Sequence, residues 1–384
     1  MNKILLLTLG MFALGIDAYI MAGILPQIAN DFHISIGTAG QTVSIFTICY
    51  AFTAPLFATF MKKTNVKRTL LAALFLFTIA NFITAVTHHF IILIISRGLA
   101  GIGAGLYSPL ASSAAVTFVS EKRRGRALST VLLGMSAGTV IGVPLSIYIA
   151  SLYGWRLAIW LIVIIGMIGI CALFTKFPIV ESSPLPTLKE RLSMFKNKQV
   201  SLVMLITMIL SFCSLGLYTY LYSIITAYGF HNFIVFIWMW GIGGIAGSFL
   251  IGFIIDFYRK PKVLLLYVIG IMFLSFICMG IFHKSALLVA ICLILWGSTG
   301  WATLAIQQKT LVEISPKHAI ISIALLSSIN YFSGSIGTMV NGILLEKGIS
   351  PITLPYVTAV MLLLAIGGQI FFISKRTVLA HQSH

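Results

Sequence analysis

Two charged side chains lie deep inside apolar segments of this sequence, the carboxylate of Asp17 and the guanidinium of Arg97. An ionised group near the centre of a bilayer costs roughly 2.5–3.5 kcal/mol on insertion scales, so such a residue is kept with a partner or for a function. At a rise of about 1.5 Å per helical residue, the two lie at comparable depths. We therefore expect both to face one cavity, because an arginine inside a span needs a carboxylate or a wet cavity. The alternatives are that Asp17 is hydrogen-bonded within helix packing and that Arg97 snorkels to the outer interface.

Neutral polar, aromatic and small residues recur at helical spacing and are candidates to surround a solute. The predicted cavity set is Met21, Gly101, Ser108, Ser112, Ser211, Ser214, Tyr218, Tyr222, Trp296, Thr303 and Gln307. Neutral hydrogen-bonding groups beside aromatic rings suit an uncharged or amphipathic organic solute better than a strongly anionic one. The same stripes also fit interior packing, and Asn330 and Asn341 fit interhelical hydrogen bonding.

The composition identifies the elements that must hold these residues. The 384 residues are 59% apolar and 9% charged, whereas about 25% of the residues in soluble proteins are charged. This composition predicts an all-α integral membrane protein, because about 20 apolar residues span a hydrocarbon core roughly 30 Å thick. Twelve segments qualify, namely 4–26, 38–61, 69–87, 90–118, 127–150, 155–176, 200–226, 233–257, 262–282, 286–312, 318–344 and 352–374.

The net charge of +17 comes from 25 Lys and Arg residues that are unevenly placed. Nearly all lie at the termini or beside even-numbered turns, while Arg156, Lys284 and Lys347 lie in odd-numbered turns. The positive-inside rule then places both termini in the cytoplasm. The excess of basic residues is explained by this topology and by attraction to anionic lipid, which argues against a nucleic-acid partner. The first apolar run continues through Asp17 to Pro26 without a cleavage site, which favours a retained span over a secretory signal.

A polar connection divides the segments into two sets of six. We expect a first bundle at 1–176, a cytoplasmic linker at 177–199 containing three prolines and several basic residues, and a second bundle with a short tail at 200–384. Membrane proteins built from parallel repeats have this organisation and handle solute at the repeat interface.

The fifth segment carries a glycine motif, Gly134, Gly138 and Gly142, followed by Pro144. Small residues four apart allow close helix contact, and the proline bends the helix, although pure packing would explain the same pattern. The glycine run at 101–105 follows no strand and lies within a span, so it is not a dinucleotide loop. The sequence offers no nucleophile with a base, metal cluster or phosphate loop, which predicts a protein that is not an enzyme and uses neither metal nor cofactor.

These motifs resemble those of the major facilitator superfamily, in its twelve-helix drug/proton antiporter branch, near bacterial exporters of purines or nucleosides, sugars and chloramphenicol. The first-helix signature is matched by Gly15-Ile16-Asp17 through Gly23-Ile24-Leu25-Pro26-Gln27-Ile28-Ala29 and Ala39-Gly40-Gln41. The fourth-helix motif is matched by Arg97-Gly98-Leu99-Ala100-Gly101, and the fifth-helix antiporter motif by Gly134, Gly138, Gly142 and Pro144. The antiporter motif departs from the usual pattern at Thr139, in place of Pro, and at Val143, in place of Gly.

The resemblance extends to charged motifs in two turns that hold the family's outward-open state. In the first half, Ala58 and Lys62 replace the usual Gly and Asp, leaving Lys63, Lys67 and Arg68. In the second half, the motif is intact as Gly252, Asp256, Arg259 and Lys260. We therefore expect weaker charge contacts from the first-half set.

The resemblance implies two six-helix bundles around a cavity that opens alternately to each side of a bacterial inner membrane. It implies a monomer that exports a small organic compound in exchange for protons, with Asp17 and Arg97 as the coupling pair and the proton gradient as the only energy source. A proton symporter or facilitator that imports a nutrient is the alternative, because the same fold works in both directions. A non-transporting membrane sensor is a further alternative, which would need an added soluble domain or a long tail.

Overall fold

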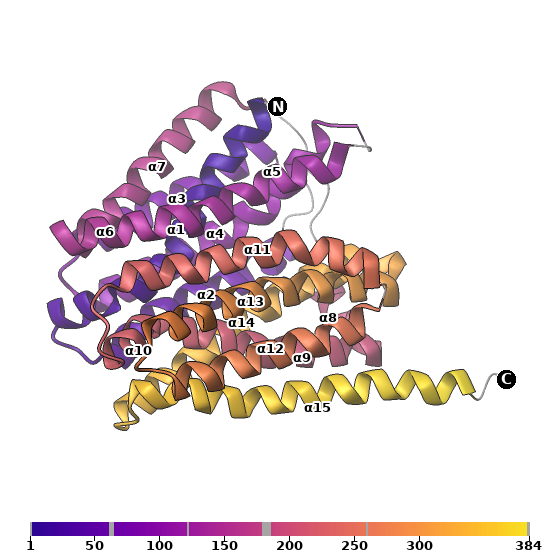
Figure 1. Cartoon of the computed structure of the whole chain (residues 1–384). Coiled ribbons are helices and arrows are strands. Elements are labelled where there is room, and N and C mark those ends of the chain that lie inside the picture. Colours follow the sequence, from indigo (N-terminus) through magenta and orange to yellow (C-terminus); the bar gives the residue numbers. More distant parts are fainter. Residues whose placement is uncertain (1, 61–64, 121–122, 179–185, 259, 382–384) are drawn as a thin grey trace. The chain divides into compact units, whose positions relative to one another are not determined.

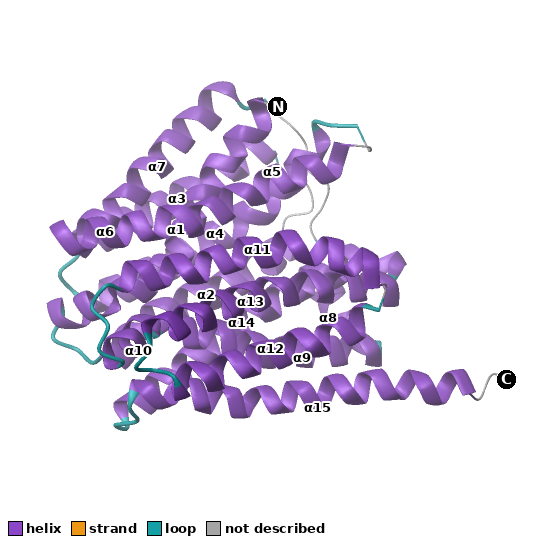
Figure 2. Ribbon diagram, in the orientation of Figure 1, coloured by secondary structure: helices purple, strands orange, loops and turns teal. Residues whose placement is uncertain are grey.

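The computed structural model describes residues 2–60, 65–120, 123–178, 186–258 and 260–381. These residues form helices and no strand (Figure 2). In a bilayer every backbone polar group needs an internal partner, and a helix provides one within its own segment. In these described ranges, twelve helical spans are long and apolar enough to cross a membrane, and each matches one predicted segment. The predicted all-α fold with twelve spans is confirmed.

The chain separates into two compact units, Met1–Leu188 and Lys189–His384. Figure 1 shows the helices of the first unit in indigo to pink. They are α1 (Asn2–Asp31), α2 (Ile36–Phe60), α3 (Val66–Val86), α4 (Phe90–Thr117), α5 (Arg124–Ala137), the π-helix η2 (Gly138–Gly142), α6 (Val143–Tyr153) and α7 (Trp155–Lys176).

The second unit contains six spans and several short helices, drawn from pink to yellow (Figure 1). The spans are α9 (Lys198–Thr219), α11 (Phe233–Tyr258), α12 (Pro261–Ile281), α13 (Ala286–Ile314), α14 (Ala319–Glu346) and α15 (Leu354–His381). The short helices are α8 (Leu188–Ser193), η3 (Met194–Lys196), α10 (Leu221–Ala227), η4 (Pro316–His318) and η5 (Pro351–Thr353).

The fifth span is not a uniform helix, because a π-turn separates α5 from α6. The backbone N–H of Val143 bonds to the carbonyl of Gly138, five residues earlier. Pro144 follows at once and has no N–H to donate, so the regular α-helical ladder is interrupted at this point. The bend that the sequence predicts at Pro144 is thus accompanied by a local widening of the helix.

The seventh predicted segment, 200–226, differs from the structure because it breaks at Tyr220 between α9 and α10. The Tyr220 hydroxyl donates to the carbonyl of Thr338 on α14 at 3.0 Å. The hydroxyls of Thr219 and Thr338 lie 2.9 Å apart. These side-chain bonds tie the end of α9 to α14, and hydropathy alone contains no signal for them.

The predicted linker contains a helix, α8, which is fixed to the second unit by Arg191. This side chain is 4% exposed, and its Nη1 donates to the Ala324 carbonyl and the Ser328 hydroxyl of α14, each at 2.8 Å. Burial lowers the pKa of Arg191 to about 10. Residues just after the boundary between the units are therefore part of the second unit's packing.

Replacing Arg191 by Met is expected to lower the free energy of unfolding by about 1–3 kcal/mol, because both buried bonds to the guanidinium are lost. Thermal unfolding of the detergent-solubilised protein measures the effect. The matched control is Lys189→Met on the same helix, where the side chain is exposed. Equal shifts in the two variants would contradict a specific role for Arg191.

Candidate functional site

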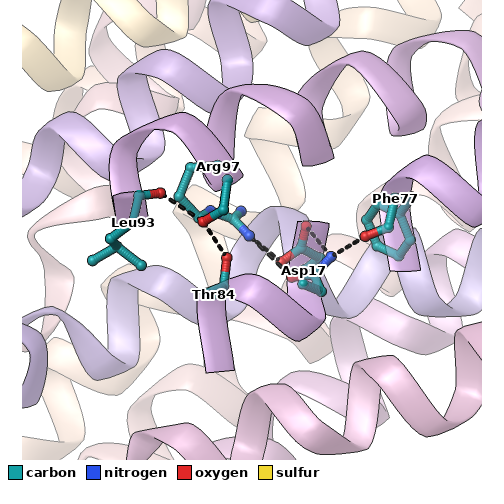
Figure 3. Close-up of polar contacts among 7 residues, drawn as sticks. Asp17, Phe77, Thr84, Leu93 and Arg97 are labelled. Carbon is teal, nitrogen blue, oxygen red and sulfur yellow. Dashed lines mark hydrogen bonds and ion pairs between the residues drawn. The ribbon is translucent and has the colours of Figure 1, made fainter. Parts of the chain in front are cut away.

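The structure brings the two predicted intramembrane charges into direct contact. Nη1 of Arg97 on α4 lies 2.8 Å from Oδ1 of Asp17 on α1 (Figure 3). The side chains are 1% and 0% exposed. Arg97 therefore does not snorkel to the interface, because its guanidinium is buried against a carboxylate. A pair this deeply buried pays a large desolvation penalty that only close charge contact and further hydrogen bonds offset.

A third residue, Asn81 on α3, completes the pair and was missed by the sequence analysis. Its Oδ1 accepts from Arg97 Nη1 at 3.2 Å. Its Nδ2 donates to Asp17 Oδ2 at 3.4 Å and to the Phe77 carbonyl at 3.1 Å. A signal was available, because Thr78, Asn81 and Thr84 form one polar helical face in an apolar segment and all three are buried.

One further contact holds Arg97 from α2, and a separate bond nearby joins α3 to α4. The guanidinium carbon lies 4.7 Å from the centroid of the Phe46 ring, a cation–π distance. The hydroxyls of Thr84 and Ser96 lie 2.8 Å apart, and Ser96 also donates to the Leu93 carbonyl at 2.8 Å (Figure 3). The residue before Arg97 is thus bonded to α3, and this bond sets the register of the two helices beside the pair.

The small-residue face of α4 packs against neighbouring helices. A Cβ atom at Gly101 would overlap the Phe46 carbonyl, and one at Gly105 would lie 2.5 Å from the Tyr50 carbonyl. Both neighbours are on α2. At Gly101 the structure shows a close contact with α2, and Phe46 of that helix lies against Arg97. A solute contact at Gly101 stays a prediction. Further along the same face, Ser108 and Ser112 are half-buried.

The glycine motif of the fifth span packs on the helix that carries Asp17. A Cβ atom at Gly134 would overlap the Thr8 carbonyl, and one at Gly138 would overlap the Phe12 carbonyl. A Cβ atom at Gly142 would overlap the Ile16 side chain. The predicted close helix contact is therefore present, and it runs along α1 up to the residue before Asp17.

Replacing Gly138 by Ala is expected to lower the free energy of unfolding by about 1–3 kcal/mol, because α1 and η2 must separate to admit the methyl group. The control is Gly270→Ala on α12, where a Cβ would meet nothing within 4 Å. That change should be neutral or stabilising by up to about 1 kcal/mol through helix propensity. Thermal midpoints of the two purified variants compare the effects, and a neutral Gly138→Ala would show that the contact is loose.

The polar stripes predicted in the second half lie on α9, α10 and α13, and Ser211, Ser214 and Trp296 bond within their own unit. Ser211 donates to Asn330 Oδ1 at 2.6 Å, and Trp296 Nε1 donates to the Ser214 hydroxyl at 2.8 Å. The Trp296 indole is 0% exposed and lies at ring-contact distance from Trp240 and Phe276. The indole thus packs within the second unit and holds the Ser214 hydroxyl, while its place in a solute cavity stays a prediction.

The other predicted cavity residues differ in burial. Tyr222 is half-buried. Those that are buried are Met21, Tyr218, Thr303 and Gln307. A cavity bounded by residues of both units stays a prediction.

Two residues of the charged motifs, Lys63 and Arg259, lie outside the described residues. Lys67 lies 6.0 Å from the centroid of the Phe174 ring, and the backbone N–H of Arg68 donates to the capping Asn65 side chain at 3.2 Å. Gly252, Asp256 and Lys260 are exposed. The expected weakness of the first-half charge contacts stays a prediction.

The sequence is similar to those of known membrane transporters. The family model of the Major Facilitator Superfamily matches residues 7–338. The chain is 28% identical to the uncharacterized MFS-type transporter YbcL of Bacillus subtilis over 375 residues, covering 95% of this chain and 94% of that protein. It is 27% identical to the chloramphenicol resistance protein of Streptomyces lividans over 273 residues, 68% of each chain.

Solved structures show the same architecture. A bacterial homolog of the human lysosomal transporter Spinster, in an inward-facing and unoccupied conformation, superposes with a TM-score of 0.77. The two sequences are 19% identical, and the match covers 98% of this chain and 97% of the other. From the family match over most of its length, the chain belongs to the Major Facilitator Superfamily and is a multi-pass membrane transporter.

Proposed function

We propose that this transporter exports a small neutral or amphipathic organic compound across the bacterial inner membrane in exchange for protons. The observation that carries the proposal is the buried pair of Asp17 and Arg97, at 2.8 Å with almost no exposed surface. A proton on this carboxylate removes the negative charge that holds Arg97, so it weakens the bond between the two side chains. Proton binding and a change in helix contacts are therefore linked at one site.

The coupling follows from the energies of the two protonation states. Ionised Asp17 is stabilised by the neighbouring guanidinium, whereas protonated Asp17 is neutral and is buried at little cost. Protonation removes the counter-charge of Arg97, and an unpaired buried charge is strongly unfavourable. A conformation that gives Arg97 access to water is then favoured, so the proton gradient biases a two-state equilibrium.

The solute class is supported by the second unit. Its candidate residues on α9, α10 and α13 are hydroxyl, amide and aromatic side chains, which recognise uncharged groups by hydrogen bonding and stacking. The similarity to a protein named for chloramphenicol resistance is consistent with a neutral organic solute. We further propose a monomer with both termini in the cytoplasm, on the basis of the distribution of Lys and Arg.

The direct test begins with a thermal-shift screen of nucleosides, sugars and amphenicols on the purified protein. A solute that stabilises the protein is then tested for counterflow in proteoliposomes. The direction of coupling is read from the pH gradient, independently of how the protein is oriented. An antiporter accumulates solute when the lumen is acidic, because protons leave as solute enters.

Two results would contradict the proposal. Accumulation only with an acidic exterior would identify a proton symporter. Counterflow without accumulation under either gradient would identify a facilitator.

A further inference from the structure

We propose that Asn81 is a positioning residue that changes hydrogen-bond partners when Asp17 gains a proton. This inference rests on the proposed function, because it describes how the same site responds to protonation. Asn81 is 0% exposed and lies between the two charges. One atom, Nη1 of Arg97, is shared by Asp17 and Asn81.

Within the described part of the chain, both hydrogen bonds of the Arg97 guanidinium are made by Nη1. That atom lies 2.8 Å from Asp17 Oδ1 and 3.2 Å from Asn81 Oδ1, so it bridges the two oxygens. The Nε of Arg97 has no hydrogen-bond partner among the described residues. Displacing one donor atom therefore breaks both polar contacts of Arg97 with Asp17 and Asn81.

A proton on Asp17 replaces that bridging donor. A hydronium ion transfers a proton to Asp17 Oδ1, which forms an O–H bond and leaves water. The new O–H donates to Asn81 Oδ1, while Asn81 Nδ2 continues to donate to Asp17 Oδ2. The result is a cyclic acid–amide pair with two hydrogen bonds, and Arg97 leaves it still charged.

An amide is suited to this exchange because it contains both a donor and an acceptor. The ionised carboxylate is an acceptor only, whereas the protonated one is also a donor. Asn81 is held in orientation by its bond to the Phe77 carbonyl of its own helix, at 3.1 Å. It therefore has a partner for Asp17 in each protonation state without leaving α3.

Few other groups are placed to respond to the same protons. The remaining titratable side chains within the helices packed on α1 and α3 are Tyr19, Cys49, Tyr50, Tyr107, Tyr148, Tyr153 and Cys171. The other charged side chains described there lie in first or last helical turns, as Lys3, Asp31, Lys67, Arg68, Arg126, Arg156 and Lys176. Within the described part of the chain, Arg97 is the charged group bonded to Asp17.

The structure provides a matched control for Asn81. Thr84 lies one helical turn further along α3 and bonds to Ser96 on α4 at 2.8 Å. This bond is buried and joins the same two helices, but it does not touch Asp17 (Figure 3). Thr84→Val therefore removes a buried hydrogen bond between the same two helices without altering the acid–amide pair.

The test measures the protonation of Asp17 directly, with protons as the probe, by infrared titration of carboxyl groups in the reconstituted full-length protein. Asp17→Asn identifies the band. Asn81→Leu is expected to shift the titration midpoint to lower pH by on the order of one unit, because the protonated state loses two hydrogen bonds to Asn81, whereas the ionised state loses one and keeps Arg97. Asn81→Asp is expected to shift it to higher pH, because two carboxylates then share one guanidinium.

Thr84→Val and Asn81→Leu are both expected to lower the thermal unfolding midpoint. Thr84→Val, in contrast to Asn81→Leu, is expected to keep the wild-type titration midpoint. An unshifted titration in Asn81→Leu would overturn the proposal and reduce Asn81 to a packing residue. That result would leave the proposed function intact, provided that Asp17→Asn removes the titrating band. A band that persists in Asp17→Asn would instead overturn proton coupling at Asp17 and the role of Asn81 with it.

Discussion

Asp17→Asn is expected to abolish solute accumulation driven by a proton gradient while counterflow of the same solute continues. One proton moving through a gradient equivalent to 100 mV supplies about 2.3 kcal/mol, which corresponds to about 50-fold accumulation. The Asn side chain keeps the shape of Asp17 and still accepts a hydrogen bond from Arg97, but it cannot release a proton. Accumulation should therefore fall from that limit to the equilibrium level.

The measurement is uptake into proteoliposomes with an acidic lumen, after thermal unfolding has shown that the variant is folded. The control is Asp31→Asn, which changes an acidic residue at the end of the same helix. Asp31 is more than a third exposed and pairs with Arg156 and Trp155 at the helix end. The Asp31→Asn variant should therefore accumulate solute as the wild type does. Full gradient-driven uptake by Asp17→Asn would disprove the assignment of Asp17.

Arg97→Ala is expected to lower the free energy of unfolding by about 3–5 kcal/mol, because it leaves the carboxylate of Asp17 buried without its counter-charge. Arg97→Lys should be less damaging, since an ammonium keeps the charge but loses the bridge to Asn81 and the planar contact with Phe46. Thermal unfolding and gradient-driven uptake rank the two variants. Equal and mild losses would indicate that the pair contributes little.

A double substitution separates stability from transport at this site. Asp17→Leu combined with Arg97→Met replaces the ion pair by apolar side chains, which is often neutral or stabilising by about 1–4 kcal/mol in buried positions. The double variant should therefore be more stable than Arg97→Ala and still show no proton-driven uptake. Recovery of uptake would show that the proton is bound elsewhere.

The sequence alone identified the twelve spans and the two charges that meet. Both follow from the cost of exposing polar groups to hydrocarbon, which forces long apolar runs into helices and makes an isolated charge conspicuous. The pairing of Asp17 with Arg97 was predictable because a buried charge needs a partner and these were the two deep candidates. The close contact of the fifth-span glycines with another helix was predictable from their spacing.

Only the tertiary structure decided the details that surround this pair. Asn81 is neutral and costs far less to bury than a charge, so hydropathy did not distinguish it from an ordinary polar residue in a helix. The approach of Gly101 to α2, the π-turn before Pro144 and the break at Tyr220 depend on contacts between residues distant in the chain. Periodicity shows which residues share a helix face, but it does not show which helix, amide or carbonyl lies opposite that face. For Asp17, the tertiary structure added Asn81 to the predicted ion pair with Arg97 and so defined a site of three residues.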